Sequence, residues 1–120
     1  MSLCPCGSNL DYANCCEPYI TGKENAPTPE ALMRSRYTAF EKHVEPYIKS
    51  TLAPESRADY SEKDVRTWSE NSEWLGLEII SAKGNTVEFT AKYKSDGKVL
   101  EHHEVSKFRK HNDRWYFVDG

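Results

Sequence analysis

Thr86-Val-Glu-Phe-Thr-Ala-Lys-Tyr-Lys94 is the most informative stretch of this 120-residue sequence. Apolar side chains at every second position alternate with polar and charged ones, which is the period of a strand with one buried face. Turn signals flank it, Gly84-Asn85 on one side and Asp96-Gly97 on the other. The pattern therefore predicts a strand that is joined to both of its sheet neighbours by tight hairpins.

Three further segments extend this sheet in both directions along the chain. Gly76–Ala82 is apolar and rich in isoleucine, and Val99–Arg109 is a longer and more polar strand. His111-Asn112-Asp113 marks a third turn, and Trp115–Val118 is the closing strand. Because each connection is short, the sequence predicts a four-stranded antiparallel meander.

The segment before the sheet predicts three helices. Thr28-Pro29 supplies an N-cap and a first helical residue, followed by apolar residues at helical spacing over about residues 29–43. Pro46 opens a short second helix, which Pro54 ends at the latest. Ser61-Glu-Lys-Asp64 is a capping box that starts a third. Helices followed by a meander indicate an α+β fold in which the helices cover one face of a curved sheet.

All four cysteines stand near the start, in Cys4-Pro-Cys-Gly-Ser-Asn-Leu-Asp-Tyr-Ala-Asn-Cys-Cys16. Four thiolates complete a tetrahedral zinc site and leave no position for water, so we predict one structural Zn²⁺. In this interpretation Ser8 caps a helical turn together with Asp11. A segment this short cannot build its own core, so we divide the chain into a zinc knuckle, residues 1–20, and an α+β domain, residues 21–120. The predicted ligands are Cys4, Cys6, Cys15 and Cys16.

Disulfides, free thiols, a redox site and an iron site are the alternatives to zinc. A Cys15–Cys16 bridge would be strained, and no Cys-x-x-Cys stands beside a βαβ pattern as in a thioredoxin-like protein. No apolar run follows Met1, so we expect no signal peptide and a cytoplasmic location, where thiols stay reduced. No stretch predicts membrane insertion, and a net charge of −3 gives no general drive toward nucleic acid.

The strand around Glu104 carries a candidate pocket. If Leu100 and Phe108 point inward, His102, Glu104 and Ser106 do so too. His102 and Glu104 could then form an acid–base pair, or Glu104 could form a structural salt bridge with an arginine of the first long helix. We favour the structural interpretation and assign no catalytic residue, because no known catalytic motif occurs in the sequence. The candidate pocket residues are Arg34, Arg36, Tyr37, His102, Glu104 and Ser106.

The cysteine pattern resembles the SEC-C motif, the zinc-binding tail of the preprotein translocase ATPase SecA. Pro29-Glu-Ala-Leu-Met-Arg-Ser-Arg-Tyr-Thr-Ala-Phe40, His103-Glu-x-Ser-x-Phe108 and Arg114-Trp-Tyr-Phe-Val-Asp-Gly120 resemble the YchJ family (UPF0225) of uncharacterised bacterial proteins. This resemblance implies an NTF2-like (cystatin-like) cone with a small N-terminal zinc knuckle. Members of the family often carry a second SEC-C motif after the last strand, whereas this sequence shows one.

The resemblance also implies a function. In SecA the SEC-C knuckle contacts chaperone and ribosome partners, which favours a non-catalytic zinc-binding protein that docks to a partner in secretion or translation. The contact would lie near Asn9, Asp11 and Lys23. The alternative is a small-ligand-binding protein or an enzyme that uses the pocket of the cone. NTF2-like domains often pair through the sheet, so a homodimer is a further expectation.

Overall fold

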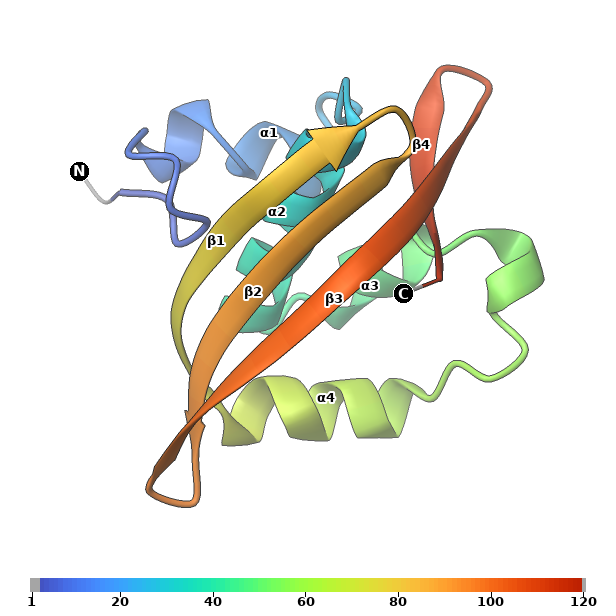
Figure 1. Ribbon diagram of the computed structural model, residues 1–120. Coiled ribbons are helices and arrows are strands. Elements are labelled where there is room, and N and C mark those ends of the chain that lie inside the picture. The colour runs from blue at the N-terminus through green and yellow to red at the C-terminus, as the bar shows by residue number, and fades with distance from the viewer. Residues whose placement is uncertain (1–2, 120) are drawn as a thin grey trace.

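The computed structural model describes residues 3–119 and confirms the α+β architecture (Figure 1). None of the helices in this range is long and apolar enough to cross a bilayer. The elements in chain order are η1 (Tyr12–Asn14), α1 (Glu17–Ile20), α2 (Pro29–Glu41), α3 (Glu45–Ser50), η2 (Pro54–Ser56), α4 (Glu62–Asn71), β1 (Glu73–Lys83), β2 (Thr86–Ser95), β3 (Lys98–His111) and β4 (Arg114–Asp119).

The sheet has the order β1-β2-β3-β4, and every pair is antiparallel, as the meander requires. Asp96-Gly97 and Asn112-Asp113 each have two consecutive positive φ angles, between 51° and 79°, as type I′ hairpin turns demand. In the turn between β1 and β2 only Gly84 has a positive φ, which matches a type II′ turn. The turn residues therefore fix the register of all three hairpins.

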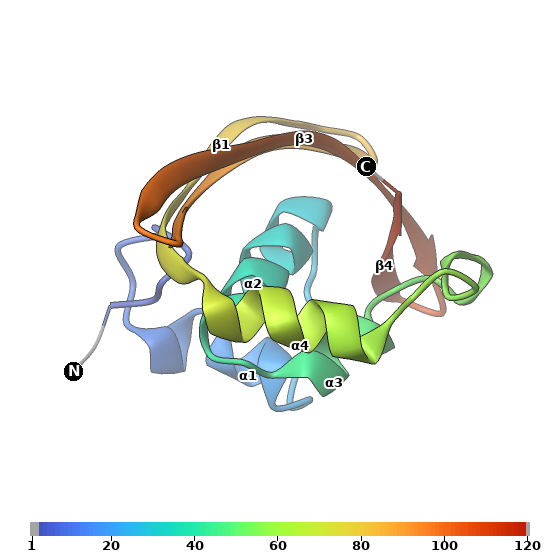
Figure 2. The ribbon, with the colours of Figure 1, turned by 90° about the horizontal axis from the view of Figure 1, so that it is seen from below.

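The sheet curls around α2, which lies inside its concave face (Figure 2). Register shifts in the β1–β2 pair, between Trp74 and Gly76 and between Ile79 and Ser81, mark irregularities that bend a strand. A third shift follows Lys107 in the β3–β4 pair. Because a bent sheet surrounds the helix on several sides, its inner face can enclose both a core and a cavity.

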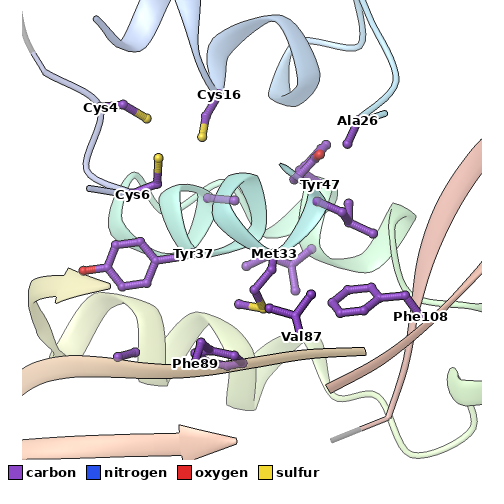
Figure 3. Packing of buried hydrophobic residues seen from close by; sticks show 14 residues of the cluster. Cys4, Cys6, Cys16, Ala26, Met33, Tyr37, Tyr47, Val87, Phe89 and Phe108 are labelled. Atoms are coloured by element: carbon purple, nitrogen blue, oxygen red, sulfur yellow. The ribbon is translucent and has the colours of Figure 1, made fainter. Parts of the chain in front are cut away.

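Helix α2 is covered on two sides, and this placement organises the whole molecule. Met33 and Tyr37 face the sheet, where they meet Val87 and Phe89 of β2 (Figure 3). On the opposite side of α2 lie the cysteine side chains of the N-terminal segment (Figure 3). Cys4, Cys6 and Cys16 belong to the same buried cluster as the core of the sheet. The N-terminal segment therefore packs as part of the main core.

The helix ends differ from those that the local sequence signals predict. The helix predicted over 29–43 ends at Glu41, because His43 adopts a left-handed backbone with φ 62°. The Val44 N–H then bonds back to the Ala39 carbonyl, which closes the last turn. The His43 side chain is exposed, and its Nδ1 lies 2.8 Å from Ser69 Oγ. Neither α1 nor η2 was indicated by the sequence pattern.

Candidate functional site

The four cysteine sulfurs of the N-terminal segment come together in one cluster. All four Sγ atoms lie within 4.8 Å of one another. The side chains of Cys4, Cys6 and Cys16 are buried, and that of Cys15 is half-buried. All four are free cysteines, and the Cys6 and Cys15 sulfurs are 3.6 Å apart. This donor set is compatible with a bound metal ion, because four thiolates surround one centre.

Two short backbone structures bring these sulfurs together. In the first, the Cys4 N–H donates to the Leu10 carbonyl at 2.8 Å, and Gly7 turns the chain with φ 83°. In the second, η1 reverses the chain, and Cys16 then stands at the N-cap of α1. The first structure presents one pair of cysteines and the second presents the other, so the two pairs face each other.

The prediction for Ser8 was wrong in its geometry. The helical turn η1 begins only after Asp11, and the Asp11 side chain makes no capping hydrogen bond. Ser8 Oγ instead accepts the Leu10 N–H at 3.2 Å and lies 3.1 Å from Cys15 Sγ. Ser8 therefore contacts the sulfur cluster directly, as a neighbour of one of the predicted ligands.

Helix α2 contributes two polar side chains to the cluster from the opposite side. Thr38 Oγ1 donates to Cys16 Sγ at 3.4 Å and lies 3.6 Å from Cys4 Sγ. Arg34 Nη1 donates to the Cys6 carbonyl at 2.7 Å. Thr38 was not among the predicted site residues, although its spacing of four residues from Arg34 places both on one helix face. The available signal for this contact was a small polar residue, Thr38, on a buried face of the helix.

The crowded sulfurs shift one another's pKa values in different directions. The pKa of Cys6 is lowered far below that of a free thiol, because Cys16 and Cys4 hydrogen-bond to its thiolate. Burial raises the pKa of Cys15 to about 11. The pKa of Cys16 is also raised, because it shares hydrogen bonds with Cys4 and Cys6. Full ionisation of the cluster thus needs a compensating cation, which a divalent metal supplies.

Gly7 is the point where the cysteine segment touches the sheet, and it offers a direct test of that contact. A Cβ at Gly7 would lie 3.1 Å from the Leu77 carbonyl oxygen of β1. Gly22 has the same φ of 83° but nothing within 4 Å of its Cβ position. We expect Gly22→Ala to cost about 1 kcal/mol of unfolding free energy from backbone strain, and Gly7→Ala roughly 1 kcal/mol more. Urea denaturation measures both, and equal losses would contradict a tight contact with β1.

A second candidate site lies inside the cone. A cavity of about 210 Å³ opens between α2, α4 and the concave face of the sheet. Four predicted pocket residues line it: Arg36 and Tyr37 from α2, and His102 and Glu104 from β3. Ser106 is buried behind them and donates to Glu104 Oε2. Arg34 points instead to the cysteine segment.

The predicted salt bridge to Glu104 is absent among residues 3–119. The Glu104 carboxylate bonds to His102 Nε2 at 2.9 Å and to the Ser106 hydroxyl, and no arginine lies within ion-pair distance. Arg36 donates to the Ile48 carbonyl instead. The structure thus brings His102 and Glu104 together as a pair.

Comparison with known families matches both parts of the chain. A family model described as YchJ, middle NTF2-like domain, matches residues 28–120, and the SEC-C motif model matches residues 2–18. A UPF0225 protein of Geobacter sulfurreducens is 47% identical over 99% of this chain and 78% of its own length. One from Serratia proteamaculans is 40% identical over 98% of this chain and 82% of its own length.

Two solved structures share the whole fold. The solution structure of a SEC-C motif protein from Rhodopseudomonas palustris superimposes with a TM-score of 0.90 at 41% identity, over 98% of this chain and 96% of that one. The crystal structure of a SEC-C motif protein from Psychrobacter arcticus gives 0.85 at 33% identity, over 99% and 81%. The arrangement of cysteine segment, helices and meander is therefore shared with proteins that carry this motif.

Proposed function

Since this chain belongs to the YchJ (UPF0225) family and carries a SEC-C motif before its NTF2-like domain, we propose that it is a non-catalytic zinc-binding protein whose knuckle docks to a protein partner. The observation that carries the proposal is the convergence of four cysteine sulfurs at one centre, with an apolar patch exposed beside it. The partner we expect is a protein of the secretion or translation machinery.

The metal in this proposal is one structural zinc ion. Zinc takes tetrahedral thiolate sites, and four protein ligands leave no open position at which water could be activated. Thr38 and Ser8 contact the sulfurs from two sides, as hydrogen-bonding side chains around a metal commonly do. Elemental analysis of freshly purified protein should find one zinc per chain, and a chelator should release four reactive thiols. Iron in place of zinc, or thiols oxidised in pairs, would overturn this assignment.

The proposed contact surface is a knuckle patch formed by Leu3 and Leu10. Leu3 and Leu10 are 63% and 53% exposed, although the N-terminal segment contains few apolar residues. Leu3 pairs with Asp11 in an isolated antiparallel bridge and the Cys4 N–H bonds to the Leu10 carbonyl, so the two leucines lie in adjacent segments of the knuckle, one register step apart. Exposed apolar side chains on a short structured segment are a feature of protein-binding surfaces.

Serine substitutions in the knuckle patch test the docking role without touching a cysteine. We expect purified wild-type protein to cosediment with ribosomes, and Leu3→Ser/Leu10→Ser to lose at least about fivefold in the bound fraction while it keeps its zinc. Val99→Ser is the matched control, since Val99 is 63% exposed on β3 and outside the patch. Equal recovery of all three proteins would contradict docking through the knuckle patch.

A further inference from the structure

The cavity inside the cone has features that the zinc-knuckle function does not use. We propose that it binds a compact apolar carboxylate whose anionic group is held by Arg36. Arg36 comes from α2, is only 7% exposed and lines the cavity. Met33, Tyr37 and Phe89, which line the cavity, lie on the sheet side of α2, whereas the labelled cysteines lie on the other side (Figure 3). The proposal is therefore independent of the knuckle.

The Arg36 side chain is 7% exposed, and only one of its three guanidinium nitrogens donates a hydrogen bond within residues 3–119. Its Nη1 donates to the Ile48 carbonyl at 2.8 Å and to Thr51 Oγ1 at 2.7 Å. Its central carbon lies 4.6 Å from the centroid of the Phe117 ring. Nε and Nη2 donate no hydrogen bond within residues 3–119, and no carboxylate there lies within 4.0 Å. Buried arginines are ordinarily paired with an anion, so this side chain has room for one.

The charge at this site persists at neutral pH. Burial lowers the pKa of Arg36 to about 10, mainly by desolvation of the guanidinium. That value still leaves the group cationic under cellular conditions. An anion in the cavity would therefore meet the Arg36 charge in surroundings where water screens it weakly, and the nearby Glu104 carboxylate would offset part of that attraction.

The carboxylate of Glu104 faces the same cavity but is already satisfied. One oxygen pairs with His102 Nε2 and the other accepts from Ser106 Oγ. The groups that still lack a hydrogen-bond partner thus belong to Arg36. This favours an anionic ligand over an ammonium ligand that the aromatic rings would bind.

The remaining walls define the apolar part of the ligand. Phe40, Trp68, Trp74 and Phe89 contribute aromatic surface, and Trp68 packs edge-on against Trp74 with ring centroids 5.4 Å apart. A volume of about 210 Å³ is below the range of drug-sized pockets. The ligand class that fits is a carboxylate with one ring or a short branched chain.

Four probes of similar chemistry separate the candidate ligands in one titration series. Isothermal titration calorimetry compares benzoate with neutral benzamide, cationic benzylamine and small acetate. We expect benzoate to bind at least about tenfold more tightly than each of the other three, because only benzoate offers both a ring and an anion. Equal affinity for benzamide or benzylamine would overturn the role of Arg36, and equal affinity for acetate would overturn the apolar requirement.

The tryptophan indole N–H signals report where benzoate binds. Trp68 and Trp74 line the cavity, whereas Trp115 Nε1 donates to the Pro27 carbonyl outside it. We expect shifts of the Trp68 and Trp74 signals in proton–nitrogen correlation spectra and none for Trp115. A shift confined to Trp115 would place the ligand elsewhere and overturn the proposal.

Three substitutions complete the test. Arg36→Met should remove the preference for benzoate over benzamide, and Arg109→Met, which removes an exposed charge paired with Glu55, should keep it. If Arg36→Met does not fold, Ala91→Leu decides, because Ala91 lines the cavity and a leucine there fills it while Arg36 stays in place. Undiminished benzoate binding by folded Ala91→Leu would overturn the cavity as the site.

Discussion

Replacing Cys16 by serine is expected to remove the metal and to destabilise the entire domain by about 3 kcal/mol or more. Cys16 is 1% exposed and belongs to the buried cluster that also contains Leu32 and Met33 of α2. If the proposed ion is lost, the segment that covers one side of α2 should be released, which would expose that helix face to water. The destabilisation should therefore appear in a single cooperative unfolding transition, measured by urea denaturation at the secondary-structure signal.

Cys15→Ser separates the contribution of the metal from that of packing. Cys15 is half-buried, so its sulfur contributes a ligand but little buried surface. We expect this variant to lose zinc as fully as Cys16→Ser does and to lose less unfolding free energy. A chelator added to wild-type protein should lower the midpoint of thermal unfolding in the same direction. Cys16→Ser protein with wild-type stability would show that the knuckle is an independent appendage.

The fold was predictable because its signals are local. Alternation in Thr86–Lys94 indicates which strand face is buried, and Asp96-Gly97 fixes a turn within two residues. The candidate site was predictable for the same reason, since four cysteines within thirteen positions have little freedom to separate. The sequence could not show which side of α2 packs against the cysteine segment and which side packs against the sheet.

Arg34 and Arg36 illustrate the limit. Residues that are two positions apart in sequence are separated by about 200° around the helix axis, so the side chains of Arg34 and Arg36 face nearly opposite directions. In an ordinary surface helix one of them would face solvent. Here the cysteine segment covers one side of α2 and the sheet covers the other, so Arg34 reaches the Cys6 carbonyl and Arg36 reaches the cavity. Helix periodicity alone argues against assigning both arginines to one pocket, whereas which of the two faces the cavity depends on tertiary packing that no local pattern contains.

Thr38 lies one helical turn beyond Arg34, and its substitution is expected to have a large effect on zinc binding. Thr38→Val is expected to weaken zinc binding by about 10- to 100-fold while the fold is retained. The Thr38 hydroxyl is fully buried and donates to Cys16 Sγ at 3.4 Å, so it stabilises negative charge on that sulfur. Valine has nearly the same shape and removes only the hydrogen bond, which leaves a buried thiolate with one donor fewer.

Thr38→Ser is the matched control, because it keeps the hydroxyl and removes a methyl group. Competition with a chromophoric chelator gives the zinc affinity of each variant, and urea denaturation in excess zinc gives the stability. We expect Thr38→Ser to bind zinc like the wild type even if it loses some stability through the small cavity it creates. Wild-type zinc affinity in Thr38→Val would show that the hydroxyl only fills space. The reduced affinity we expect would instead mean that α2, a helix of the NTF2-like domain, helps to hold the metal of the SEC-C knuckle.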